Sequence, residues 1–102
     1  MIVITGRIRV QPSELDALLR SASEVASASR QERGCGAYSF SVDIDDPLVI
    51  RLLEEWESDE ALEAHFSTTH FQKFAESLVR AAADGPSEFT RYEVSSVAPL
   101  FG

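Results

Sequence analysis

The stretch EEWESDEALEAHFSTTHF, residues 54–71, decides how this chain folds and contains its one tryptophan and both of its histidines. It opens with the end of an alternating segment, in which Leu52, Glu54 and Trp56 would lie on one face of a sheet. Ser58 then offers a typical N-cap for a short helix. The stretch therefore predicts a strand that turns directly into a helix, with the side chains most capable of chemistry close together.

A strand and an amphipathic helix are expected before this stretch. The alternating apolar positions of the strand are Ile2, Ile4, Ile8 and Val10. Pro12 suits the first turn of the helix, and Gly34 lies beyond its end. The apolar positions of the helix recur at helical spacing and are Leu15, Leu18, Leu19, Ala22, Val25 and Ala26.

A hairpin is expected in the middle of the chain. Apolar residues alternate with polar ones at Tyr38, Phe40, Val42 and Ile44. The turn signal Asp45-Asp46-Pro47 separates them from LVIRLLEEWE at residues 48–57. These two segments predict antiparallel neighbours. Cys35, between Gly34 and Gly36, is interpreted as a turn residue.

A longer helix and a last strand complete the predicted order. Thr69 with Gln72 would form a capping box at the helix start. Gly85-Pro86 would end the helix, and residues 89–97 would form the strand. The apolar stripe of this helix is Phe71, Phe74, Ala75, Leu78, Val79 and Ala82. The order strand, helix, strand, strand, helix, strand predicts one α+β domain over residues 1–102, with a ferredoxin-like antiparallel sheet.

Composition narrows the function classes. The chain has 102 residues and a net charge of −8, which disfavours nucleic acid and anionic membranes as partners. No apolar run approaches the roughly 20 residues of a membrane helix, so a cytoplasmic protein is expected. A domain this small would bury more apolar surface by pairing with a second copy. Cys35 is the only cysteine, which excludes an intramolecular disulfide and a multi-cysteine metal site.

Glu54 and Trp56 each allow two interpretations. If the helices cover their face of the sheet, burial disfavours the charged form of Glu54. The carboxyl group would then be either a structural hydrogen-bond acceptor or a tuned proton acceptor. Trp56 would be either packing in a small core or a flat surface for an aromatic ligand.

The histidines form the second candidate feature. His65 and His70 are five residues apart, which on a continuous helix separates them by roughly 140° around the axis. They would not chelate one metal as an i, i+4 pair does. A break at residues 66–69, rich in Ser and Thr, could instead turn both imidazoles toward one cavity. Two histidines beside a tryptophan strand thus form a hypothetical acid-base site.

These residues also carry a family resemblance. The runs E-x-W-E-S, A-L-x-A-H and T-x-H-F resemble the central motif of antibiotic biosynthesis monooxygenase domains, in particular the small quinol-monooxygenase-like members. The run Glu-Arg-Gly-Cys followed by Tyr38 is similar to their entry into the second strand. The resemblance covers nearly the whole chain.

The resemblance implies a homodimer in which two sheets face each other as an α/β barrel, with Leu53 among the interface candidates. It implies a pocket between the sheet and the helices of each subunit. It also implies oxidation of an electron-rich aromatic, such as a quinol or a polyketide anthrol, by molecular oxygen. Family members of this kind use no flavin, haem or metal, because the substrate itself supplies the electrons.

The resemblance also suggests roles for the candidate residues. His65 or His70 would accept or relay the phenolic proton, and Glu54 would orient a histidine or the substrate. Trp56 would stack against the substrate ring. The pocket walls would include Tyr38 and Phe71. No cofactor-binding or metal-binding residue is expected.

Three alternatives stay open. A dimeric domain that only binds a small ligand would need the pocket but no proton acceptor. An isomerase of the same fold would use acid-base residues without oxygen. Haem-degrading relatives carry an asparagine in the first strand and a histidine in the last helix, where this chain has Arg7 and Ala75.

Overall fold

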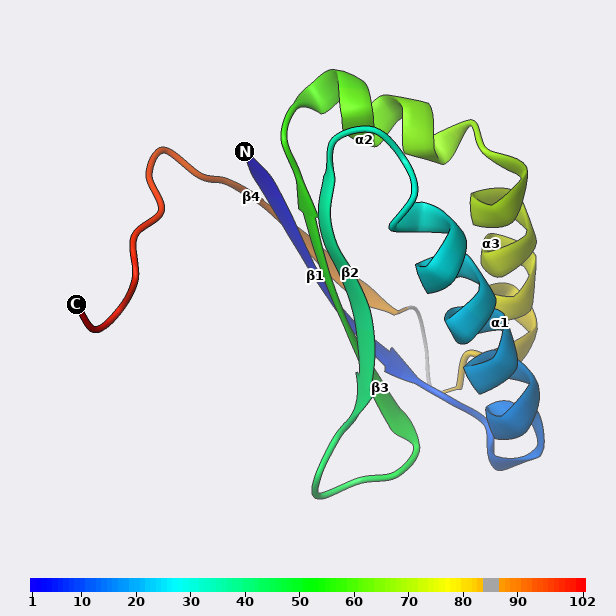
Figure 1. Ribbon diagram of the computed structural model, residues 1–102. Helices are drawn as coiled ribbons and strands as arrows, with labels where there is room; N and C mark the ends of the chain where they lie inside the picture. The colour runs from blue at the N-terminus through cyan, green and yellow to red at the C-terminus, as the bar shows by residue number, and fades with distance from the viewer. Residues whose placement is uncertain (84–86) are drawn as a thin grey trace.

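A computed structural model describes residues 1–83 and 87–102 and shows the predicted α+β, ferredoxin-like architecture. The elements run in the expected order (Figure 1). The strands are β1 (Ile2–Arg9), β2 (Cys35–Val42), β3 (Val49–Trp56) and β4 (Glu88–Glu93). The helices are a short 3₁₀ helix η1 (Pro12–Glu14), α1 (Leu15–Ser29), α2 (Asp59–Phe66) and α3 (Thr69–Ala81).

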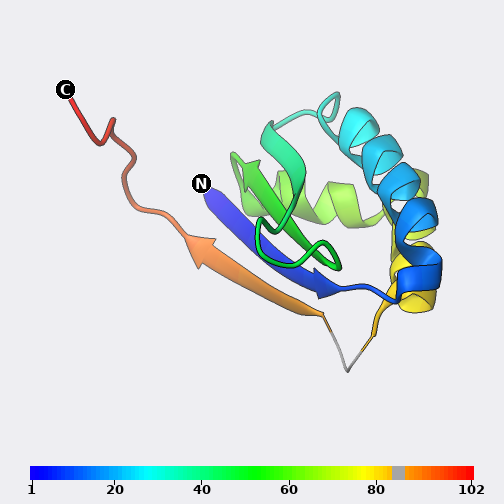
Figure 2. The same cartoon turned by 90° about the horizontal axis from the view of Figure 1, so that it is seen from below.

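The sheet is antiparallel, with strand order β2-β3-β1-β4. Helices α1 and α3 lie side by side on one face of it (Figures 1 and 2). No helix of the described chain covers the other face, which we call the outer face. A single layer of helices therefore creates one core, between the sheet and α1 and α3.

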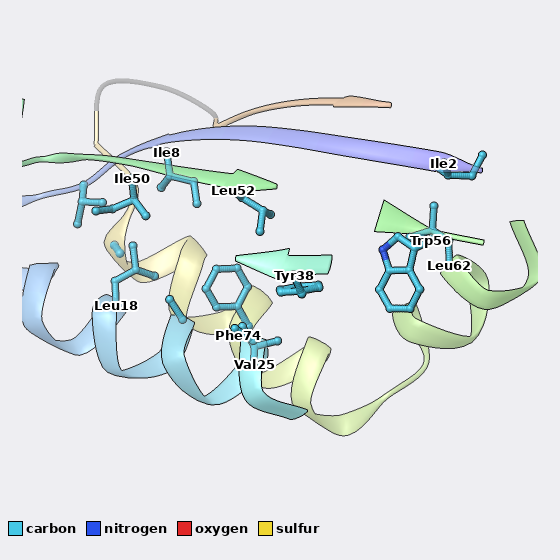
Figure 3. Packing of buried hydrophobic residues seen from close by; sticks show 14 residues of the cluster. Ile2, Ile8, Leu18, Val25, Tyr38, Ile50, Leu52, Trp56, Leu62 and Phe74 are labelled. Atoms are coloured by element: carbon cyan, nitrogen blue, oxygen red, sulfur yellow. The ribbon is translucent and has the colours of Figure 1, made fainter. Parts of the chain in front are cut away.

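Alternation in β3 fixes what enters that core. Leu52, Glu54 and Trp56 are buried, whereas Leu53 on the outer face is 40% exposed. The prediction for this strand is thus confirmed. Figure 3 shows Ile50 and Leu52 of the sheet pointing toward Leu18 and Val25 of α1.

The hairpin and the last strand are shorter than predicted. Strand β2 ends at Val42, and Ile44 lies in the turn with 96% of its surface exposed. The reason is Asp43, whose Oδ2 accepts hydrogen bonds from the backbone N–H of Asp45 and Asp46 and so starts the turn early. Strand β4 ends at Glu93, and the following segment runs away from the sheet (Figure 1). The predicted strand over residues 94–97 was therefore wrong.

Cys35 is the first residue of β2 and not a turn residue, so that interpretation was also wrong. The turn lies just before it, at Gly34, whose φ of 87° is a left-handed conformation that favours glycine. A β-bulge separates Cys35 from Ala37 in the pairing with β3.

Helix α3 differs from its prediction at both ends. Its N-cap is Thr68, whose Oγ1 accepts a hydrogen bond from the Phe71 N–H at 3.2 Å, so the predicted capping box at Thr69 was wrong. Val79 is 80% exposed, and Ala81 rather than Ala82 is buried. The helix ends at Ala81, and the predicted terminator Gly85-Pro86 lies outside the described residues.

No helix within residues 1–83 and 87–102 has the length and apolar character needed to cross a lipid bilayer.

Candidate active site

A cavity of about 270 Å³ lies between the helix-side face of the sheet and helices α2 and α3. Its volume lies just below the roughly 300–1,000 Å³ that is usual for ligand cavities. Much of its wall is apolar and includes Ile4, Leu52, Leu62, Phe71, Phe74 and Leu78. Polar groups reach it from Tyr38, Glu54, Thr90 and Arg91. A mostly apolar cavity with few polar groups suits one small, largely apolar ligand.

Glu54 is a buried carboxyl group on the wall of this cavity. Its Oε1 accepts a hydrogen bond of 2.8 Å from Nε1 of Trp56. Burial, opposed in part by that hydrogen bond, raises the pKa of Glu54 to about 7. Near neutral pH the group therefore populates both protonation states, and general acid-base chemistry is open to a side chain in that condition.

A hydrogen-bonded chain runs from the cavity wall into the interior of the protein. The hydroxyl group of Tyr38 lies 3.3 Å from Nε2 of His65, and Nδ1 of His65 lies 2.6 Å from Oε2 of Glu32. His65 is completely buried, and burial lowers its pKa. A neutral imidazole that donates from Nδ1 to a carboxylate leaves Nε2 as an acceptor, so the Tyr38 hydroxyl donates to it. Tyr38 thus couples the cavity to His65.

The second histidine meets the same carboxylate. Nε2 of His70 lies 2.7 Å from Oε2 of Glu32, and the ring centroids of the two histidines are 6.0 Å apart. Thr68 caps α3 and also donates a 2.7 Å hydrogen bond to the carbonyl of His65, which fixes the break between α2 and α3. The break brings the two imidazoles together as predicted, but on one carboxylate oxygen and not in a shared cavity. We call Glu32, His65 and His70 the Glu32 cluster.

The predicted site residues separate into two groups. Tyr38, Glu54 and Phe71 line the cavity. His65, His70 and Trp56 do not line it. Trp56 instead packs against His65, with ring centroids 4.8 Å apart and planes at 35°, so stacking of its indole on a ligand finds no support in this geometry.

Of the two roles predicted for Glu54, orienting a histidine and orienting the substrate, the first finds no support in the structure. Glu54 bonds to Trp56, whereas Glu32 holds both imidazoles. Glu32 lies in the connection between α1 and β2, where a polar run without periodicity gives no sign of which side chain turns inward. One sequence feature could have pointed to Glu32: it lies two residues before Gly34, in the Glu-Arg-Gly-Cys run.

Cys35 has the properties of an inert thiol. Burial and the nearby carboxylates, Glu32 foremost, raise its pKa. A raised pKa reduces the thiolate fraction, which is the nucleophilic form. The cysteine therefore contributes no visible nucleophile to the site.

Fold and cavity together define a ferredoxin-like α+β domain with a buried carboxyl group facing a ligand-sized cavity. The sequence profile described as antibiotic biosynthesis monooxygenase matches residues 1–77. The chain belongs to this family.

Similar proteins agree with that assignment. The chain is 28% identical over 95 residues to "Putative monooxygenase YcnE" of Bacillus subtilis, covering 93% of this chain and 99% of that protein. It is 28% identical over 88 residues to "Probable quinol monooxygenase YgiN" of Escherichia coli, covering 76% and 85%. A crystal structure of an antibiotic biosynthesis monooxygenase superposes with a TM-score of 0.85 at 25% identity, covering 94% of this chain and 100% of that chain.

Proposed function

We propose that this protein is a cofactor-independent monooxygenase that oxidises an electron-rich aromatic, such as a quinol or a polyketide anthrol, with molecular oxygen. The family and the monooxygenase names of two relatives support the reaction class. The observation that carries the proposal is Glu54, a buried carboxyl group with a pKa of about 7 on the wall of an apolar cavity.

The chemistry needs a base and a dry cavity. Removal of the phenolic proton makes the substrate a one-electron donor to oxygen, and the resulting radical pair recombines to form a carbon–oxygen bond. For an anthrol, the hydroperoxide formed at the ring carbon then loses water and leaves a carbonyl group. One oxygen atom of O₂ enters the product and the other leaves as water, so the substrate carbon supplies all four electrons.

Glu54 is the proposed proton acceptor. Its position on the cavity wall places it within reach of a bound phenol, and its pKa is matched to neutral pH. The apolar remainder of the wall excludes water and would favour a planar aromatic ring.

Tyr38 is the proposed proton relay. Its hydroxyl group donates to His65, so its oxygen can accept from a substrate hydroxyl while its own proton moves to Nε2 of His65. Glu32 keeps Nδ1 of His65 protonated and stabilises the imidazolium that forms, and His70 fixes the carboxylate of Glu32 in place. The histidines would thus act through Tyr38 rather than by direct contact with the substrate.

We also propose that the protein is a homodimer that pairs through its outer face. Leu53 and Tyr92 are 40% and 50% exposed on that face. The large apolar side chains Val97, Leu100 and Phe101 are exposed in the segment after β4. A second copy would remove this apolar surface from water.

Oxygen uptake by metal-stripped protein with reduced naphthoquinones and anthrols tests the reaction. The wild type should consume oxygen above the autoxidation rate. Glu54→Gln and Tyr38→Phe should each lower the rate by roughly 10²-fold or more, because each removes one proton-transfer group and keeps its shape. Glu63→Gln, at an exposed position on α2 away from the cavity and the outer face, is the control and should keep the wild-type rate.

Equal uptake by the wild type and both cavity variants would contradict the proposed roles. Binding of the same compounds without uptake by the wild type would contradict the oxygenase proposal itself and favour a ligand-binding domain. Conversion of a small carbonyl compound without oxygen would favour an isomerase.

A further inference from the structure

The Glu32 cluster has the composition and convergence of a metal site. One ligand atom from each of Glu32, His65 and His70 lies within 4.8 Å of the other two. The three side chains come from different segments: the α1–β2 connection, the last turn of α2 and the first turn of α3. Helix capping by Thr68 holds the two histidine segments together.

Both imidazoles are aimed at one point. Nδ1 of His65 and Nε2 of His70 lie 2.6 Å and 2.7 Å from the same oxygen of Glu32. A ring N–H points along the direction that the nitrogen lone pair takes once the proton has left. A cation close to the present position of that oxygen would therefore lie in line with both lone pairs.

We propose that Glu32, His65 and His70 bind a divalent transition-metal cation. Metal–ligand bonds of about 2.0–2.2 Å place tetrahedral ligand atoms roughly 3.3–3.5 Å apart. A cation at the present position of Oε2 lies 2.6 Å and 2.7 Å from the two nitrogens, so each imidazole must approach it by roughly 0.5–0.7 Å and the Glu32 oxygen must withdraw by roughly 2 Å, one metal–oxygen bond. Rotation of the Glu32 side chain supplies that withdrawal, because Glu32 lies in a connection and not in a helix or strand.

The ligand types indicate the class of metal. Two imidazoles and one carboxylate favour zinc, iron(II), cobalt(II) or nickel(II), whereas magnesium and calcium prefer oxygen ligands. Three protein ligands leave a coordination position for water. His70 is the ligand nearest solvent, with 27% of its side chain exposed, so the cation can enter from its side. The net charge of −8 also favours a cation over an anion.

Tyr38 would support the metal as an outer partner. When Nδ1 of His65 binds a metal, the ring proton moves to Nε2, which lies 3.3 Å from the Tyr38 hydroxyl group. Nε2 then donates to Tyr38, and the hydrogen bond survives with its direction reversed. The relay proposed above from Tyr38 to Nε2 of His65 therefore operates only in the metal-free protein. A metal-bound imidazole commonly donates its second N–H to a neighbouring acceptor in this way.

The one tryptophan of the chain provides a direct readout. The ring centroids of Trp56 and His65 are 4.8 Å apart, so a paramagnetic ion at the cluster should quench the fluorescence of Trp56. We expect Co²⁺, added to metal-free protein from which any histidine tag has been removed, to quench this fluorescence with one ion bound per chain. Zn²⁺ should compete with Co²⁺ and restore the emission.

Variants locate the site. Glu32→Gln and His70→Gln should each weaken Co²⁺ binding by at least about tenfold, since each removes one direct ligand. Glu63→Gln, at an exposed position on α2, is the matched control and should bind as the wild type does. If Glu32→Gln fails to fold, His70→Gln decides the outcome, because its side chain is partly exposed.

Absence of saturable Co²⁺ and Zn²⁺ binding by the wild type would overturn the proposal. So would equal affinity in the wild type and His70→Gln. These measurements need neither substrate nor oxygen. A failed metal site therefore leaves the proposed oxygenase intact, and a failed oxygenase leaves the metal site intact.

Discussion

For Glu54, local sequence predicts which face of the sheet the side chain lies on, and tertiary packing decides which group it binds. Alternation in β3 predicts that Glu54 and Trp56 share the buried face, and the structure confirms it. The sequence could not show that the two side chains bond to each other, because it does not give rotamers. Glu32 was missed for a related reason. Its inward direction depends on the left-handed turn at Gly34, and its partners are more than 30 residues away along the chain.

Burial of Glu54 has a measurable cost to stability. Its pKa rises from an ordinary 4.5 to about 7, which disfavours the ionised form in the folded protein by about 3 kcal/mol at roughly 1.4 kcal/mol per pKa unit. Between these two values the folded protein keeps a proton that the unfolded chain has lost. The free energy of unfolding contributed by this group therefore falls as the pH rises from about 4.5 to 7.

Glu54→Gln should remove this dependence. At pH 4 the variant and the wild type should be similarly stable, and at pH 8 the variant should be more stable by up to about 3 kcal/mol. Urea unfolding at both pH values measures the difference. A constant difference between Glu54→Gln and the wild type would contradict the raised pKa.

Among the elements, the break between α2 and α3 decides how the histidines meet. Sequence reasoning found the break from the Ser and Thr content of residues 66–69 but placed the cap at Thr69. The structure uses Thr68, because only this hydroxyl group both caps α3 and reaches the carbonyl of His65. Neighbouring threonines differ little in propensity, so the choice depends on three-dimensional contacts that a local pattern does not contain.

Thr68→Ala should therefore destabilise the protein by about 1 kcal/mol, the usual cost of losing an N-cap. Thr69→Ala should change stability much less, because Thr69 is exposed inside the first turn of α3. Urea midpoints of the two variants and the wild type provide the comparison. A larger loss for Thr69→Ala would mean that the capping box predicted from sequence is the one that forms in solution.

At the scale of the whole molecule, the arrangement of strands and helices was predictable because each amphipathic segment has one apolar side. The order of elements and the four-stranded antiparallel sheet match the expectation. The ends of the elements were less predictable. Asp43 stops β2 before Ile44, and the segment after Glu93 leaves the sheet although Val94 and Val97 are β-formers. Apolar residues after Glu93 could be buried either in a longer strand or against a partner chain, and a local pattern does not distinguish the two.

The proposed dimer gives a test at this scale. Leu53→Asp places a charge on the outer face and should shift the protein toward monomer, as measured by sedimentation velocity over a range of concentrations. Val79→Asp adds the same charge at an exposed apolar position on α3 and should leave the association state unchanged. A monomeric wild type, or an equal effect of both substitutions, would contradict pairing through the outer face.

The bulge in β2 has a consequence for how this domain tolerates length changes. One extra residue between Cys35 and Ala37 lies between the turn that positions Glu32 and the strand that carries Tyr38. Cys35 and Ala37 already pair with the adjacent residues Trp56 and Glu55, so deleting Gly36 would leave a regular pairing in the same register. The cavity wall would keep its geometry, because Tyr38 would still lie opposite Glu54. The deletion would remove only the local bend of the bulge, and with it the direction from which the turn carrying Glu32 enters β2.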